Sequence, residues 1–338
     1  MLYRHKAVQG ALLLMFFAAS FSAPAQKSEK HKLKEKYANL PEVIWRDRGD
    51  VQKLDLLYGA GGKEHAPDPN DTFTFEKEDM NGTSPKFEMK DSSGVRWKVK
   101  LGAEPQAETA ATRLLWAAGY FVDEDYFLPE LKVEGLTSLS RGPKSEVQPG
   151  GIVRNVRLKR KDKENKKTGN WDWDKNPFVG TREFNGLRVM MALINNWDLK
   201  TVNNAIYVAD GERRYEASDV GASFGKTGNS ITRSKSDLNG YEKSRFIEKT
   251  TPTEVEFVLH SRPFILSAVN VPNYVGRTRM EGIVKHIPRE DAKWLGGILG
   301  KLSEKQIRDC FRAGGYSDDD VEEYTQDVLK RIAELNAL

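Results

Sequence analysis

Asn196-Trp197-Asp198-Leu199-Lys200-Thr201-Val202-Asn203 lies in the most informative region of this 338-residue chain. Sixteen positions after Asn203, a second aspartate begins the triplet Asp219-Val220-Gly221. Carboxylate and amide oxygens bind divalent cations, and an ionised carboxylate can also accept a proton from a hydroxyl group. The spacing of Asp198, Asn203 and Asp219 therefore predicts a metal-dependent site that acts on a hydroxyl.

The elements around these residues can be predicted from periodicity. Residues 181–195 carry apolar side chains at helical spacing and end just before Asp198. Residues 205–208 and 214–217 indicate two short strands joined by a glycine turn, and the second strand leads to Asp219. The predicted order is a buried helix, a polar loop, a hairpin and the second aspartate.

A strand and a helix upstream supply complementary charges. Residues 95–101 alternate strictly, which predicts a strand with Lys98 and Lys100 on its polar face. Residues 105–118 predict a helix, with proline favoured in its first turn. Glu108 falls on or beside the apolar face of this helix, so it needs a cation, which Lys98 or Lys100 can provide.

These parts together predict phosphoryl transfer, which depends on positioning and charge neutralisation. The reaction needs a lysine for the nucleotide phosphates, a glutamate that orients it, metal ligands and a base for the acceptor hydroxyl. Each motif is weak alone, and turn or helix-end roles are the plain alternatives. The candidates in chain order are Lys100, with Lys98 as its rival, then Glu108, then Asp198 as the base, and Asn203 and Asp219 as metal ligands.

The loop before the lysine strand is the weakest part of the pattern. Gly82 and its neighbours could present backbone N–H groups to phosphates. They lack the repeated glycines of a G-x-G-x-x-G loop, so a plain hairpin turn is an equal alternative.

The motifs resemble those of the protein kinase-like superfamily. Asn196 to Asn203 is similar to the kinase catalytic loop, with Asn-Trp in place of His-Arg, and Asp219-Val220-Gly221 is similar to Asp-Phe-Gly. Glu108-Thr109-Ala110-Ala111 resembles the Glu-x-Ala-Ala-like helix of atypical members. These members are the HipA-type bacterial kinases and the secretory-pathway kinases of the Golgi lumen. The resemblance covers about residues 71 to 225.

The resemblance implies an α+β, bilobal fold with a β-rich N-lobe at 71–150 and a mainly helical C-lobe at 151–338, after a linker and extension at 26–70. It implies ATP as the donor and Mg²⁺ or Mn²⁺ as the metal. Lys200 would contact the transferring phosphate. The missing His-Arg pair removes the usual link to a phosphorylated activation loop.

The N-terminus predicts export. Residues 1–25 combine basic residues, an apolar run at 11–21 and small residues at Ala23-Pro24-Ala25, as a cleaved signal peptide does. A membrane anchor is the alternative, but the run is shorter than the roughly 20 apolar residues of a spanning helix. We therefore expect no membrane span after cleavage. The formal net charge of +4 gives no argument for nucleic acid.

The sequence therefore predicts an exported kinase-like phosphotransferase that moves a phosphoryl group from ATP to a protein or small-molecule hydroxyl. The alternative is a catalytically inactive kinase-like module that binds a nucleotide or another ligand. Export would place the chain in a periplasm, outside the cell, or in a eukaryotic secretory lumen. A periplasm holds little ATP, whereas a secretory lumen would supply it.

Overall fold

The computed structural model describes residues 32–82, 84–161, 165–228, 232–259 and 271–338. The predicted signal peptide lies outside these residues. The chain divides into two compact units, Met1–Leu40 and Pro41–Leu338, and the second contains every element discussed below. In the described part of the chain, none of the helices combines the length and the apolar character needed to cross a membrane.

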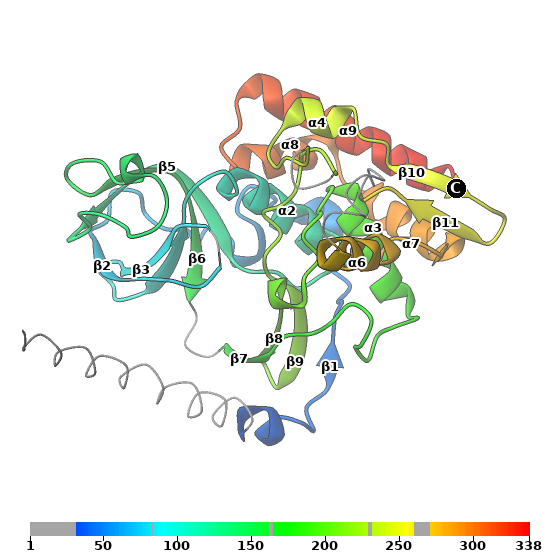
Figure 1. Ribbon diagram of the computed structural model, residues 1–338, viewed down its shortest axis with the longest axis horizontal. Helices are drawn as coiled ribbons and strands as arrows, with labels where there is room; N and C mark the ends of the chain where they lie inside the picture. Colours follow the sequence, from blue (N-terminus) through cyan, green and yellow to red (C-terminus); the bar gives the residue numbers. More distant parts are fainter. Residues whose placement is uncertain (1–31, 83, 162–164, 229–231, 260–270) are drawn as a thin grey trace, which may run out of the picture. The chain divides into compact units, whose positions relative to one another are not determined.

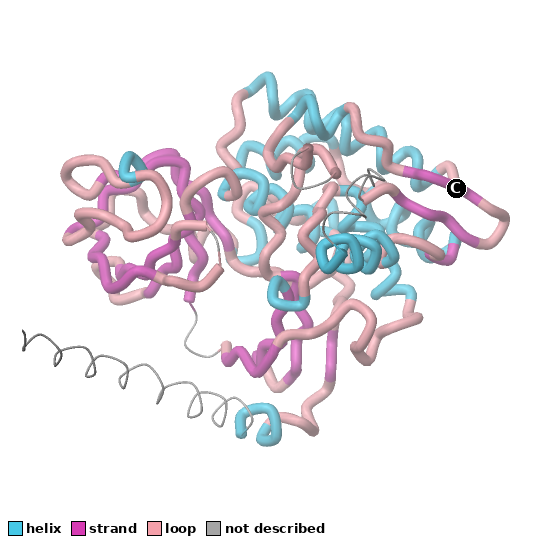
Figure 2. Tube along the Cα trace, in the orientation of Figure 1, coloured by secondary structure: helices cyan, strands magenta, loops and turns pink. Residues whose placement is uncertain are grey.

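Five strands form a closed barrel in the order β2-β3-β4-β6-β5 (Figures 1 and 2). Trp97 and Val99 of β4 are buried inside it, while Lys98 and Lys100 lie on the opposite face of the strand, as the alternation predicted. The strands are β2 Phe73–Glu78, β3 Lys86–Lys90, β4 Arg96–Lys100, β5 Asp125–Glu134 and β6 Ile152–Lys161.

Strand β6 contains a run of basic residues that in sequence is typical of a solvated surface. It pairs with both β4 and β5, and Arg157 lies opposite Lys100 in the register. Arg157 is buried because it lies between two strands and below a helix. The barrel thus extends past residue 150, where the sequence analysis divides the lobes.

Helix α2, Pro105–Ala117, packs against β5, β6 and helix α8, Glu304–Ala313. Its first residue is proline, and its buried face carries small side chains at Ala107, Ala110 and Ala111. Small residues let the helix backbone approach the barrel closely. This brings Glu108, on the same helix, toward the outer face of β4.

The remaining helices share one large apolar core with α2. Ser303 and Gln306 form a capping box at the start of α8, and Cys310 is a buried free thiol. These helices are α3 Arg182–Leu193, α4 Leu238–Glu242, α6 Val271–Gly282, α7 Arg289–Leu299, α8 Glu304–Ala313 and α9 Asp318–Asn336. Short 3-10 helices are η1 Val51–Lys53, η2 Gly59–Gly61, η3 Lys144–Glu146 and η4 Thr201–Asn203.

Two small sheets complete the second unit. The predicted hairpin is formed by β8 and β9 at the centre of the sheet β1-β9-β8-β7. Its strands are β1 Glu42–Val43, β7 Lys166–Gly169, β8 Asn204–Ala209 and β9 Glu212–Ala217. The other sheet contains β10 Ile247–Thr250, β11 Glu254–Phe257 and β12 Ile287–Pro288.

Residues 41–70, which the sequence suggested were a linker and extension, belong to the compact unit. Strand β1 pairs in parallel with β9, and Ile44, Val51 and Leu56 are buried in the large core. These apolar residues are isolated among turn-forming residues and form no periodic pattern. Their burial therefore could not be predicted from periodicity. The chain has the predicted α+β fold, with a β-rich lobe followed by a mainly helical lobe.

Candidate functional site

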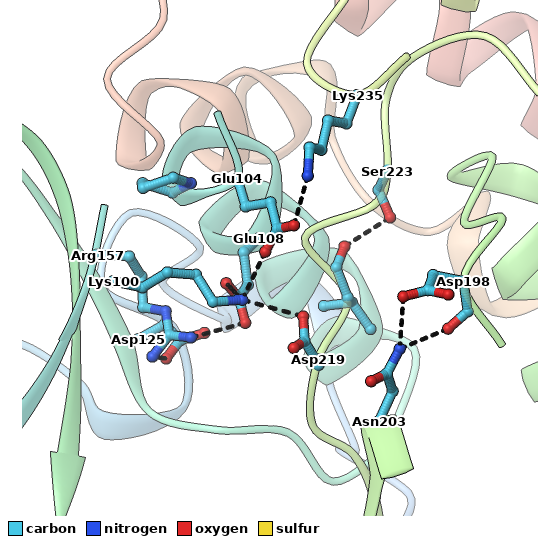
Figure 3. A network of polar contacts seen from close by, with 12 residues as sticks. Lys100, Glu104, Glu108, Asp125, Arg157, Asp198, Asn203, Asp219, Ser223 and Lys235 are labelled. Atoms are coloured by element: carbon cyan, nitrogen blue, oxygen red, sulfur yellow. Dashed lines mark hydrogen bonds and ion pairs between the residues drawn. The ribbon is translucent and has the colours of Figure 1, made fainter. Parts of the chain in front are cut away.

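Lys100 lies at the centre of a cluster of carboxylates (Figure 3). Its Nζ is 2.7 Å from Glu108 Oε2, 2.8 Å from Glu104 Oε2 and 3.0 Å from Asp219 Oδ1. The Lys100 side chain is only 1% exposed, so these three carboxylates enclose its ammonium group. The structure therefore brings together the predicted lysine, glutamate and second aspartate, which come from β4, α2 and the end of β9.

Lys98, the rival lysine, does not join this cluster. It forms an ion pair with Asp79, which lies just after β2. Lys98 instead lines a cleft of about 560 Å³ that it shares with Lys159 of β6 and Tyr207 of β8. The two lysines share a strand face, but only Lys100 is close enough to the N-terminal end of α2 to reach Glu108.

A second buried pair supports Glu108 from behind. Arg157 Nη2 donates to Glu108 Oε1 at 2.8 Å, and Arg157 Nη1 lies 3.5 Å from Asp125 Oδ1. Glu108, Asp125 and Arg157 are all buried. Losing one partner of such a network leaves an uncompensated charge, so the network holds the Glu108 carboxylate in one orientation.

The cluster shifts the pKa values of its members in opposite directions. Burial by itself would lower the pKa of Lys100, but Glu108 and Asp219 raise it well above its ordinary value. Burial would raise the pKa of Asp219, yet Lys100 lowers it far below its usual range. Both groups are therefore charged at neutral pH, as a site that binds a metal nucleotide requires.

Backbone hydrogen bonds join the second aspartate to the loop that precedes β8. The backbone N–H groups of Ser218 and Asp219 both donate to the carbonyl oxygen of Asn203, each at 3.0 Å. Asn203 and Asp219 are therefore held beside one another, although sixteen residues separate them. Figure 3 shows Asp198 and Asn203 next to the segment that carries Asp219.

Asp198 is oriented by a local turn. Helix α3 ends where Asn195 adopts a φ of 53°, a left-handed conformation that asparagine tolerates. The Asp198 N–H then donates to Asn196 Oδ1 at 3.0 Å. Asn203 Nδ2 donates to the Asp198 carbonyl at 2.7 Å and to Asp198 Oδ2 at 3.1 Å, and Lys200 Nζ lies 2.7 Å from Asp198 Oδ1.

Trp197 anchors the segment that follows Gly221. Its Nε1 donates to the Ser234 carbonyl at 2.8 Å, and the guanidinium of Arg233 lies 3.9 Å from the centre of its ring. Trp171 and Trp173, by contrast, pack in the large core. The Asn-Trp pair thus holds this loop through an indole group.

Glu104 and Lys235 are site residues that the sequence analysis missed. Glu104 caps α2 and reaches Lys100 four residues earlier, while Lys235 Nζ lies 2.5 Å from Glu104 Oε1. A Cβ atom on Gly221 would lie 2.8 Å from Glu104 Cβ, so the glycine makes room for this side chain. Lys100 and Glu104 are four residues apart, which predicts a contact when both residues lie in one helix. Here the spacing crosses the turn from strand to helix, so it did not predict the ion pair.

Gly82 lies in the turn between β2 and β3, with a φ of 72° that favours glycine. Its carbonyl accepts a hydrogen bond from Arg141, which also binds the Asp79 carbonyl. Arg141 thus ties this turn to the barrel. No contact in the described residues joins Gly82 to Lys100 or Asp219.

The residues present fit a divalent cation through oxygen donors. The Asp219 side chain is 35% exposed, and the Asn203 side-chain amide belongs to the loop that is bonded to Asp219 through the backbone. Glu104 and Glu108 each have a carboxylate oxygen within 4.8 Å of one on Asp219. Mg²⁺ and Mn²⁺ prefer such hard oxygen ligands.

The Glu104 contacts predict a pH-dependent contribution to stability. Burial would raise the pKa of Glu104, but Lys100 and Lys235 lower it to about 2. A lowered carboxyl pKa stabilises the fold above the unfolded value of 4.5 and loses that effect as the pH falls toward 2. We expect Glu104→Gln to lower the free energy of unfolding by about 2 kcal/mol near pH 6, and by much less near pH 2.

Urea unfolding of both proteins from pH 2 to pH 6 measures this difference. Glu134→Gln, at an exposed position of β5, is the control and should change little at any pH. A Glu104→Gln effect that is the same at pH 2 and pH 6 would contradict the assignment.

Comparisons with known proteins identify likeness in structure alone. No protein-family model and no curated protein sequence matches the chain. Among solved structures, the Helicobacter pylori proinflammatory kinase CtkA is similar at 10% identity and a TM-score of 0.43, covering 78% of this chain and 96% of its own. The Golgi casein kinase is similar at 10% identity and a TM-score of 0.33, covering 96% of this chain and 94% of its own.

A lysine strand, a glutamate helix, a loop with Asp198 and Asn203, and a hairpin that ends at Asp219 occur in that order and meet at one place. This order and this meeting point are what the resemblance to the protein kinase-like superfamily implies.

Proposed function

We propose that this chain is an exported phosphotransferase that uses ATP with Mg²⁺ or Mn²⁺ to phosphorylate a hydroxyl group on a protein or a small molecule. The observation that supports it is the convergence of Lys100, Glu108 and Asp219, with Asn203 bonded through its backbone to Asp219. These groups are the charge-neutralising half of a phosphoryl-transfer site.

The reaction assigns a role to each residue of the loop and the cluster. Asp198 accepts the proton of the acceptor hydroxyl. The oxygen of that hydroxyl forms a bond to the transferring phosphorus, while the bond from phosphorus to the ADP oxygen breaks. Lys200, paired with Asp198, lies where it can contact the transferring group. Asn203 and Asp219 would hold the cation, which neutralises phosphate charge when bound.

The cleft beside Lys98 supports a nucleotide-sized ligand. Its volume of about 560 Å³ lies within the usual range for small-molecule sites. Lys98 is two residues before Lys100 on the same face of β4, so about 7 Å of strand separates the cleft from the carboxylate cluster. A nucleotide spans this distance, with its base at the cleft and its phosphates near Lys100.

One observation favours a binding module as the second candidate. Lys100 is enclosed by three carboxylates, so a phosphate reaches its ammonium only if one of them moves. Gly82 is also the one glycine in the turn between β2 and β3. A chain that binds the nucleotide in this closed arrangement would not transfer its phosphate.

Purified protein without residues 1–25 tests the two candidates together. ATP with Mg²⁺ or Mn²⁺ should raise the unfolding temperature in a metal-dependent manner, because a ligand that binds only the folded state stabilises it. Label from γ-labelled ATP should also appear on the chain or on a mixture of dephosphorylated proteins. A shift without transfer supports the binding module, and the absence of any shift contradicts both candidates.

Export is a separate part of the proposal. It is supported by the sequence of residues 1–25 and is tested by expressing the full chain in a cell with a secretory pathway. Cleavage near Gln26, found by sequencing the N-terminus of the exported protein, is the expected result. Retention of the full-length chain in the cytosol would contradict export and leave the site assignment unaffected.

A further inference from the structure

Lys86 is a second cation beside the carboxylate cluster. It is the first residue of β3 and lies directly opposite Lys100 in the antiparallel register. It also follows the turn that contains Gly82, and a Cβ atom on Gly82 would lie 3.2 Å from Lys86 Nζ. The Lys86 side chain therefore extends along the edge of that turn, beside the site.

Lys86 differs from the other lysines of β3, β4 and β6, because it has no carboxylate partner in the described part of the chain. Within the described residues, its Nζ forms no ion pair or hydrogen bond with any group. The other lysines of β3, β4 and β6 are each paired with a carboxylate: Lys90 with Glu76, Lys98 with Asp79, Lys100 with the cluster, Lys159 with Asp123, and Lys161 with Glu88. Because its neighbours are paired and Lys86 is not, we infer that a bound anion would balance the charge of the Lys86 ammonium.

The electrostatic surroundings of Lys86 agree with this interpretation. Partial burial and the charge of Lys100 lower its pKa, while Asp219 and Glu108 act in the opposite direction. Lys86 is therefore within the electrostatic range of the cluster without touching it. A lysine ammonium offers three N–H donors, and those of Lys86 are available to a ligand.

The enclosed state of Lys100 gives Lys86 a specific role. Lys100 is 1% exposed, so the phosphates of a nucleotide meet the partly buried Lys86 before any carboxylate has to leave Lys100. A kinase with a glycine-rich loop holds these phosphates with backbone N–H groups. In this chain the corresponding turn offers Gly82 and, immediately after it, an unpaired ammonium.

We propose that Lys86 binds the terminal phosphates of the donor nucleotide and replaces the missing glycine-rich loop. The inference rests on the proposed function and names a residue that the kinase resemblance does not supply. Because the ligand group is a polyphosphate, Lys86 distinguishes ATP from adenosine, which has the same base and ribose and no phosphate.

Binding measurements on the full mature chain test this inference. Isothermal titration gives the dissociation constants of ATP, with Mg²⁺ present, and of adenosine for wild type, Lys86→Met and Lys86→Arg. Losing a hydrogen bond to a charged group should weaken ATP binding by about tenfold or more in Lys86→Met. Adenosine binding should not change, and Lys86→Arg should restore most of the ATP affinity.

Matched variants separate a phosphate contact from a structural effect. Lys90→Met removes a lysine from the same strand and face, four residues away, and should leave ATP affinity unchanged. Lys86→Gln gives the same comparison if the methionine variant does not fold. Unfolding midpoints without nucleotide should match those of wild type.

Each outcome decides a distinct point. Equal ATP affinity in wild type and Lys86→Met, or a parallel loss of ATP and adenosine binding, would overturn the role of Lys86 while the proposed function stands. If the wild-type chain binds neither ATP nor adenosine, the proposed function fails, and the inference about Lys86 fails with it.

Discussion

Asp198→Asn is expected to slow phosphoryl transfer by about 10²–10⁴-fold, the usual contribution of a positioned general base. The asparagine keeps the size of the side chain and can still accept from Asn203 Nδ2, which lies 3.1 Å from Asp198 Oδ2 in the wild-type chain. It cannot take the proton of the acceptor. Nucleotide affinity should therefore stay near the wild-type value while transfer is lost.

Single-turnover transfer from γ-labelled ATP, measured together with ATP affinity, separates these two effects. Asp174→Asn is the control, since Asp174 is exposed and pairs with Arg279 away from the site. Transfer that continues at the wild-type rate in Asp198→Asn would remove Asp198 from the mechanism.

The second large effect is expected for Asp219→Asn, which should abolish the metal-dependent part of ATP binding. Mutation of a residue that only orients a metal ligand typically lowers metal affinity by about 10–100-fold. Mutation of a direct ligand should lower it at least as much. The substitution also takes one of three carboxylates from Lys100, so each variant is compared with its own nucleotide-free state.

Thermal unfolding with ATP, with and without Mg²⁺, measures this loss. Asp319→Asn is the control, because Asp319 is an exposed residue in the first turn of α9 and does not line the cleft. A metal-dependent shift that survives in Asp219→Asn would place the cation elsewhere.

Much of the site could be predicted because its residues lie on strongly patterned elements. Alternation identified β4 and placed Lys98 and Lys100 on one face, and helical spacing placed Glu108 beside the apolar face of α2. The choice between the two lysines could not be made from the strand. It depends on where α2 crosses the barrel, which is a tertiary property.

Other residues were hidden by their sequence surroundings. Arg157 lies in a run of basic residues, which usually forms a solvated surface, and its burial follows from the central position of β6. Lys235 lies in a polar segment without periodicity, and its contact with Glu104 spans 131 residues. Long-range pairs of this kind leave no local pattern in one sequence.

The spacing of the charged cluster has a consequence for the folding of the chain. Lys100, Glu104 and Glu108 lie within nine residues, so their contacts have low contact order and close short loops at little entropic cost. Asp219 follows Lys100 by 119 residues and needs the barrel, the helix and the hairpin in place. We expect the lysine–glutamate half to form early and the Asp219 half to dock late. In a partly folded chain, Lys100 would then already be paired with Glu104 and Glu108. Under the proposed function, such a chain would bind no metal nucleotide until folding is complete.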